Sequence, residues 1–240
     1  MFHSEILFKK SILMFEEYLK PTLFIDSDHQ AVIDFASLHI GNNKTDIDVA
    51  CSLYYAIRDG IRYNPYMDAE SIKAYRASDA VETKEGWCVP KAALMVACLR
   101  ANGIPARPGY ADVRNHLASQ RLLDILGTDL FPWHSYCEAY IRGKWVKSTP
   151  SFNLLLCEKF QLKPLEFDGF TDSIFHEYDQ VGNKHMQYVY ERGTFDDVPM
   201  DEIIKTFRKQ YGPGFFNGIR GDLFEEIDNE IQANLGKGIK

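Results

Sequence analysis

One segment constrains the fold more than any other. Residues 90–102, which read PKAALMVACLRAN, are apolar on nearly every face of a helix. A surface helix has an apolar stripe and a polar face, whereas a helix that is apolar all round is buried. Gly103 follows at the position where helices commonly end. The sequence therefore predicts a helix that runs through the middle of the domain, with the other elements packed around it.

Short strands are expected after this helix. Residues 106–113, 135–141 and 144–148 have strand-like composition, and Arg142-Gly143 between the last two is a tight hairpin signal. These patterns predict a hairpin close to the buried helix.

The length of 240 residues is that of one large domain rather than two full ones. Such a chain buries enough apolar surface to need no disulfide or metal for its core. We interpret residues 1–240 as a single domain with three parts. Residues 1–64 are expected to be helical, residues 65–153 to form the catalytic core, and residues 154–240 to form a C-terminal extension.

The C-terminal extension has weaker local patterns. A strand is expected at residues 186–190 and a helix at residues 201–211. Gly212-Pro213-Gly214 should end that helix. The remaining residues are polar, and we expect them to form a mobile tail.

The charge argues against one class of partner. The chain has 27 Lys and Arg against 34 Asp and Glu, a net charge of −7, and no basic block. Proteins that bind duplex nucleic acid gain most of their affinity by neutralising phosphates with Lys and Arg. We therefore expect no nucleic-acid partner.

The cysteines and the N-terminus indicate the compartment. The five cysteines are odd in number and show no C-x-x-C spacing, so reduced thiols are expected rather than a disulfide framework. The N-terminal segment lacks the apolar stretch and cleavage site of a signal peptide. No stretch approaches the ~20 apolar residues that span a bilayer. We expect a cytoplasmic protein without a membrane partner. The sequence gives no indication of the oligomeric state.

Cys88 is the candidate nucleophile, in the run Gly86-Trp87-Cys88-Val89-Pro90 at the first turn of the buried helix. The positive end of the helix dipole favours a thiolate there. The backbone N–H of Cys88 is a candidate oxyanion donor, and Gly86 leaves room for a substrate. The competing interpretation is that Cys88 is a small buried hydrophobe, as most cysteines are.

His134 is the candidate partner of Cys88, because a cysteine nucleophile needs an imidazole that can be distant in sequence. It precedes an expected strand, in which His134, Tyr136 and Glu138 share one face. A lone histidine is otherwise a surface or core residue. Trp87 and Trp133 each precede a candidate catalytic residue, and either wall the site or pack in the core.

No metal or cofactor is expected. His116, His176 and His185 lack metal-ligand spacing with cysteines or acids. Asp172, Asp179 and the acidic residues after Phe195 form no compact calcium-binding loop, so we interpret them as a solvated acidic loop.

The two candidate blocks together resemble a known superfamily. The run GWCVPKAALMVACLRANGIPARPGY is similar to the nucleophile helix of the transglutaminase-like superfamily, and WHSYCEAYIRGKWV is similar to its histidine strand. The resemblance covers residues 86–153. It implies an α+β fold related to papain, in which the helix that carries Cys88 packs on an antiparallel sheet that carries His134. It also implies that Cys88 attacks a carboxamide, with His134 as general base and then general acid.

The third catalytic member departs from that pattern. The superfamily usually has Asp-Pro-Thr four residues after the strand tryptophan, whereas this chain has Thr149 at that place. Three alternatives remain for the group that orients the imidazole. They are the Thr149 hydroxyl, the Asn153 amide, or a carboxylate from Asp168 or Asp172. We favour a neutral group from the turn that contains Thr149 and Asn153.

Two functional hypotheses follow. The first is a cysteine protease, amidase or acyltransferase that forms a thioester with a protein or peptide amide and resolves it with water or an amine. The second is a binding module of the same fold, in which the triad has decayed at Thr149. A structural domain with an inert Cys88 is a third, weaker interpretation.

Overall fold

The fold combines helices with an antiparallel sheet. A computed structural model describes residues 15–42, 45–115, 118–175, 178, 182, 184–212, 215 and 220–237. Within these residues the helices are η1 (Glu16–Leu19), α2 (Gln30–Ile40), α3 (Asp46–Gly60), η2 (Ile72–Ala74), α4 (Ala77–Thr83), α5 (Cys88–Ala101), α6 (Gln120–Leu126), α7 (Leu154–Lys159), α8 (Met200–Tyr211) and α9 (Leu223–Lys237). The strands are β1 (Arg62–Tyr63), β2 (Glu85–Gly86), β3 (Ala106–Asn115), β4 (Leu130–Ile141), β5 (Lys144–Ser148) and β6 (Met186–Thr194).

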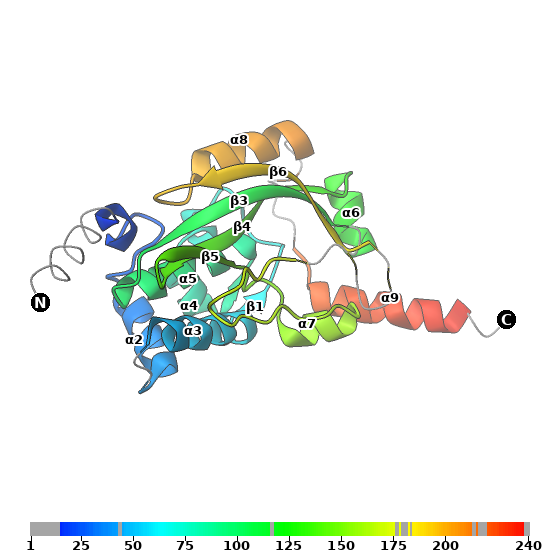
Figure 1. The fold of residues 1–240 in the computed structure, drawn as a ribbon. Helices are drawn as coiled ribbons and strands as arrows, with labels where there is room; N and C mark the ends of the chain where they lie inside the picture. The colour runs from blue at the N-terminus through cyan, green and yellow to red at the C-terminus, as the bar shows by residue number, and fades with distance from the viewer. Residues whose placement is uncertain are drawn as a thin grey trace, which may run out of the picture.

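Helix α5 is the centre of the molecule. Every residue from Cys88 to Arg100 is buried, which confirms the prediction from its all-round apolar pattern. Helices α2, α3 and α4 pack on one side of it, and strands β3 and β4 pack on another. Figure 1 shows α5 between the sheet and the helices of the N-terminal part.

Helix α5 contains two buried basic side chains, Lys91 and Arg100, and backbone carbonyl oxygens accept hydrogen bonds from both. Lys91 Nζ donates to the carbonyl oxygens of Arg58, at 3.0 Å, and Ile61, at 2.5 Å. Arg100 donates to three carbonyl oxygens, those of Lys20, Ala106 and Asp196. Buried charges are tolerated when they are hydrogen-bonded in this way. Lys91 thereby fixes the end of α3 against the helix that carries Cys88.

The main sheet has the strand order β5-β4-β3-β6, and every neighbouring pair is antiparallel. The α+β class expected from the resemblance is therefore confirmed. The β4–β5 hairpin turns at Arg142 and Gly143, both with positive φ, +49° and +85°. This is the geometry of a tight two-residue hairpin turn, as the sequence predicts.

Strand β6 comes from the C-terminal part of the chain but pairs with β3 in the main sheet. Helix α8 follows it and lies above β6 in Figure 1. Residues after position 153 therefore build one edge of the central sheet.

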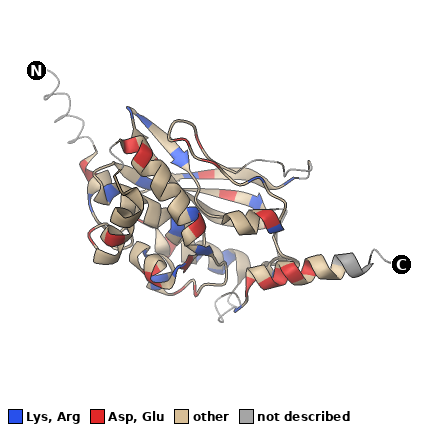
Figure 2. Cartoon of the chain, turned by 90° about the horizontal axis from the view of Figure 1, so that it is seen from below, with Lys and Arg blue, Asp and Glu red and all other residues tan. Residues whose placement is uncertain are grey.

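The prediction of a mobile C-terminal tail is wrong for residues 223–237, which form α9. Leu223 and Ile227, one turn apart, are buried. Between them, the Glu226 carboxylate accepts hydrogen bonds from Tyr66 and Arg121. Figure 2 shows α9 as a strongly acidic helix, so its polar composition reflects an exposed face rather than disorder.

None of the helices that the structure describes is long and apolar enough to cross a membrane.

Candidate active site

Cys88 is the first residue of α5, and Trp87 before it provides no side-chain cap. The backbone N–H groups of Cys88 and Val89 lie near the sulfur and lower the pKa of the thiol, as a helix start should. The backbone and hydroxyl of Ser135 act in the same direction. Burial is the larger effect and raises the pKa of the Cys88 thiol to about 11. Burial therefore favours the neutral thiol over the expected thiolate at neutral pH.

Gly86 serves the packing of α5 on its own entry segment. A Cβ at this position would come within 2.9 Å of Cγ of Pro90. Gly86 also pairs with Tyr63 in the short parallel sheet of β1 and β2. The space that the sequence assigned to a substrate at Gly86 is thus occupied by Pro90.

His134 is buried in β4, with 6% of its surface exposed. Its ring lies against Phe175, with 5.1 Å between centroids. Burial, and then the neighbouring His185, lower the pKa of His134 to about 3. Nε2 of His134 is buried and has no hydrogen-bond partner among the described residues. The imidazole is therefore neutral, the state that a general base requires.

Cys88 and His134 line the same cavity, which measures about 70 Å³. Both come from the segments that the sequence selected, the start of the buried helix and the histidine strand. No hydrogen bond joins the thiol to the imidazole among the interactions of the described residues. The side chains around them are mostly aromatic or aliphatic: Tyr63, Pro65, Trp87, Val113, Asn115, Leu122, Leu126, Phe131, Pro132, Phe152, Met186, Phe207, Tyr211 and Phe215.

The two tryptophans have different positions. Trp87 lines the cavity, with its ring near Phe207 at 5.8 Å and its Nε1–H donating to the carbonyl of Ala74. Trp133 does not line it, although it precedes His134. Its ring is 4% exposed and packs on Tyr110. Of the two expected wall residues, only Trp87 borders the cavity.

The backbone at Trp133 is strained. Its φ is +61°, a value that bulky residues rarely adopt. The register between β3 and β4 shifts here, since Ala111 is opposite His134 but Val113 is opposite Phe131. Two residues of β4 thus face Asp112 alone, which is a β-bulge. The bulge sets the direction of the peptide that leads into His134.

A polar network surrounds the bulge. The Asp112 carboxylate accepts from the Trp133 N–H at 3.1 Å and from Arg192 at 2.5 and 2.8 Å. The Arg192 guanidinium also lies over the Trp133 ring, 4.3 Å from its centroid. Trp133 Nε1–H donates to Thr206 of α8 at 2.9 Å. The sequence reasoning missed this network, although an aspartate within the apolar run of residues 109–113 was a signal for it.

Thr149 and Asn153, the favoured orienting residues, make no hydrogen bond to His134. Thr149 is buried, and its hydroxyl has no partner among the described residues. Asn153 Oδ1 accepts from the Tyr63 N–H at 2.7 Å, and its Nδ2 donates to the carbonyls of Arg58 and Ile61. Asn153 therefore fixes the junction after α3, because all its polar atoms are used there.

The two carboxylates are also used elsewhere. Asp168 accepts from the backbone N–H groups of Phe170 and Thr171, in an exposed turn. Asp172 accepts from the Lys147 N–H at 2.9 Å, at the edge of β5. Among the described residues, none of the four candidates holds the unused nitrogen of His134.

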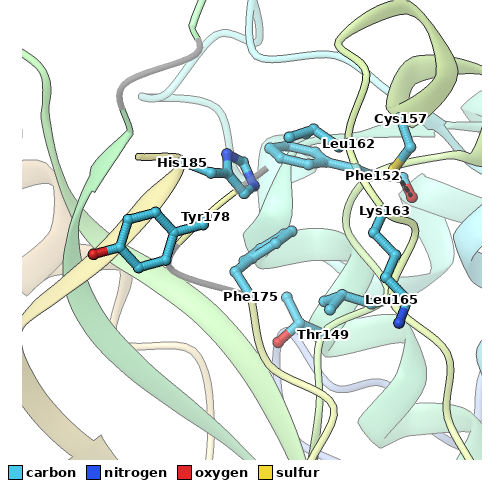
Figure 3. A pocket seen from close by; sticks show the side chains of 9 residues that line it. All are labelled: Thr149, Phe152, Cys157, Leu162, Lys163, Leu165, Phe175, Tyr178 and His185. Carbon is cyan, nitrogen blue, oxygen red and sulfur yellow. Dashed lines mark hydrogen bonds between the residues drawn. The ribbon is translucent and has the colours of Figure 1, made fainter. Parts of the chain in front are cut away.

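A second, smaller space of about 10 Å³ is bordered by Thr149, Phe175 and His185 among other residues (Figure 3). Phe152 borders both spaces. Phe175 and His185 border the smaller one, with 5.7 Å between their ring centroids. Phe175 thus borders the smaller space and also packs against the ring of His134, with 5.1 Å between centroids.

All five cysteines are free thiols, and four of them are buried. No group of three or more His, Cys, Asp and Glu is arranged to hold a metal ion in the part of the chain that the structure describes.

Comparison with known proteins gives two matches. The sequence model of the transglutaminase-like superfamily matches residues 34–150, a segment that contains Cys88 and His134. A crystal structure of a candidate cysteine protease from Cytophaga hutchinsonii is similar, with 19% sequence identity and a TM-score of 0.47. The similarity covers 79% of this chain and 49% of that protein, so the chain spans about half its length. Proteins of curated function give no match.

Proposed function

Because the chain belongs to the transglutaminase-like superfamily, we propose that it is a cysteine enzyme that acts on a carboxamide or peptide bond through a thioester. The observation that carries this proposal is that the Cys88 thiol and the His134 imidazole line one cavity. A thiol at a helix start and a neutral imidazole are the pair of groups that nucleophilic catalysis by cysteine needs.

In the proposed first step, the Cys88 sulfur attacks the acyl carbon and His134 takes the thiol proton. The C–S bond forms, and the carbonyl oxygen gains negative charge. The backbone N–H groups of Cys88 and Val89, at the start of α5, are the proposed donors to that charge. The C–N bond then breaks, and the imidazolium returns the proton to the leaving amine.

In the second step, water or an amine attacks the thioester and gives a proton to His134. The C–S bond breaks, and the imidazolium protonates the departing sulfur. Water yields a carboxylic acid, and an amine yields a new amide. The substrates that this reaction requires are protein or peptide amides, in a compartment that keeps thiols reduced.

The raised pKa of Cys88 and the lowered pKa of His134 have a mechanistic consequence. Burial disfavours both ionised forms, so the pair is neutral before substrate binds. Proton transfer to His134 must therefore accompany attack on the acyl carbon rather than precede it.

One observation favours the second candidate, a binding module. No described residue holds the free nitrogen of His134, and Thr149 stands where the superfamily has a carboxylate. An imidazole without an orienting partner loses rate, by roughly four orders of magnitude when the wrong tautomer is held. A decayed site would still bind a ligand in the cavity without turnover.

The test is detection of the acyl-enzyme. Purified protein is incubated with a panel of N-acyl amino-acid amides, with and without an amine acceptor, and its intact mass and ammonia release are measured. We expect an adduct on Cys88, lost in Cys88→Ala and strongly reduced in His134→Gln. Cys51→Ala is the matched control, because Cys51 is the half-buried cysteine on α3.

The outcomes separate the two candidates. Turnover that survives Cys88→Ala would contradict the enzyme proposal. Saturable ligand binding by the wild-type protein, without an adduct or ammonia release, would establish the binding module instead.

A further inference from the structure

The cavity at Cys88 has a distinctive lining. Among the described residues that border it, none is Asp, Glu, Lys or Arg. Asn115, Cys88, His134 and the tyrosine hydroxyls are its polar groups, and the remaining surface is aliphatic or aromatic. The chain as a whole is 25% charged, so an uncharged wall of this extent is a property of the site.

Several elements contribute to this apolar wall. Leu122 and Leu126 come from α6, Phe207 and Tyr211 from α8, and Met186 from β6. Leu122 and Leu126 are one turn apart, so they present one face of α6 to the cavity. The wall is therefore built by two helices and a strand from different parts of the chain.

The position of the cavity defines which part of a substrate enters it. An acyl carbon under attack must approach the Cys88 sulfur at bonding distance. Its oxygen must face the N–H groups at the start of α5. The group attached to the acyl carbon then occupies the space that the sulfur borders.

The size of the cavity limits that group. A single water needs on the order of 10–15 Å³ by the same measure. The cavity, at about 70 Å³, is therefore matched to a short branched side chain of a few carbon atoms.

We propose that this cavity is the acyl-group subsite and that it selects a neutral, apolar group of about the size of a leucine side chain. The inference rests on the proposed function, since it assigns the substrate of the same thiol. A charged group is rejected because an uncompensated charge is costly in an apolar enclosure without an opposite charge.

The experiment measures the alkylation of Cys88 in the full chain with Cys51→Ala, to remove the half-buried thiol. The probes are the chloromethyl ketones of N-acetyl-leucine, N-acetyl-glutamate and N-acetyl-lysine, each compared with iodoacetamide on the same protein. We expect the leucine reagent to be at least tenfold faster than both charged reagents after this normalisation. A glutamate or lysine reagent that is equally fast or faster would overturn the proposal.

A variant pair tests the wall itself. Leu126→Phe reduces the space, and Leu123→Phe makes the same change on α6 outside the lining. We expect Leu126→Phe to slow the leucine reagent at least fivefold more than it slows iodoacetamide, whereas Leu123→Phe slows neither. Equal behaviour of the two variants would contradict the assignment of the subsite.

A second readout separates failure of the subsite from failure of the enzyme proposal. The Cys88→Ala variant cannot form a thioester, so its melting temperature is measured with the amides of N-acetyl-leucine, N-acetyl-glutamate and N-acetyl-lysine. Stabilisation by the leucine amide alone supports the subsite even if Cys88 proves unreactive. Equal stabilisation by all three, or by none, overturns it.

Discussion

The carboxylate of Asp112 accepts a hydrogen bond from the backbone N–H of Trp133, at 3.1 Å. Trp133 lies in the β-bulge, directly before His134, and its φ is +61°. Left-handed backbone costs an L-residue roughly 1–2 kcal/mol, so the fold must hold it in place. Asp112, itself paired with Arg192, does so from the neighbouring strand. The position of His134 thus depends on groups that do not line the cavity among the described residues.

Asp112→Ala should therefore reduce kcat more than it raises KM, by at least tenfold, because it loosens His134 without altering the lining of the cavity. It leaves Arg192 without its carboxylate, and the side chains of the pair are 13% and 21% exposed. We expect a loss of stability of about 2–3 kcal/mol. Steady-state kinetics and urea unfolding measure the two effects. A variant with normal kcat would show that the network is only structural.

Trp133→Gly and Trp133→Ala form a matched pair, since both remove the ring. Glycine adopts positive φ freely, whereas alanine does not. We expect the glycine variant to be more stable than the alanine variant by about 1 kcal/mol. Equal stabilities in urea unfolding would mean that the bulge relaxes when the ring is removed.

The free energy of unfolding should decrease as the pH is lowered, because of His134. Its pKa is about 3 in the folded protein and 6.5 in the unfolded chain, so only the unfolded chain binds the proton between these values. Stability is therefore complete above pH 6.5 and declines as the pH falls, by up to about 1.4 kcal/mol per unit for one proton. Urea unfolding between pH 7.5 and 4.8 measures this slope.

His134→Gln should flatten that slope, because glutamine does not titrate. His39→Gln is the control, since His39 is exposed on α2. If both variants kept the wild-type slope, the folded protein would take up the proton at His134 as readily as the unfolded chain.

The alkylation rate of Cys88 should depend steeply on pH. Burial raises the pKa of its thiol to about 11. Only the thiolate is nucleophilic, so the iodoacetamide rate should increase about tenfold per pH unit below that value. Mass-spectrometric mapping at pH 7, 8 and 9 measures it. A rate that is level above pH 7 would show an ionised thiol and contradict the neutral pair.

The elements that depend mainly on local interactions were predicted from local sequence patterns. The buried helix and the hairpin at Arg142 and Gly143 were legible because each pattern lies within one stretch of chain. The start of β4 was not, because Pro132 lies in the strand and proline usually marks a break or a bulge. The strand that the sequence predicted at residues 135–141 begins at Leu130 in the structure.

The two candidate catalytic residues, Cys88 and His134, were selected from the sequence and line one cavity, but their surroundings were not predicted. Asp112 and Arg192 are 80 residues apart and meet only because β6 pairs with β3. Asn153 was a reasonable orienting candidate by position, yet its amide is used by the backbone after α3. The prediction of a thiolate at Cys88 did not anticipate burial, which raises the pKa of the thiol. The degree of burial is set by tertiary packing, which the local sequence does not show.

The last prediction concerns the docking of α9. The Glu226 carboxylate accepts from Tyr66, from Ser119 at 3.1 Å and from Arg121. Ser119 caps α6, the helix whose leucines wall the cavity at Cys88. Glu226→Gln removes the charge that Arg121 pairs with and weakens two further hydrogen bonds. We expect a loss of about 1–2 kcal/mol and, because α6 loosens, iodoacetamide labelling of Cys88 several-fold faster than in the wild-type protein.

Glu225→Gln is the matched control for that prediction, because it makes the same charge change at an exposed neighbour on α9. Urea unfolding and the labelling rate should both stay at their wild-type values in this variant. If the two variants behaved alike, the net charge of α9 would matter rather than its docking. If Glu226→Gln lowered stability but left labelling unchanged, α9 would stabilise the fold without controlling access to Cys88. The expected result, faster labelling in Glu226→Gln alone, would instead make the contact between α9 and α6 a determinant of how Cys88 is reached.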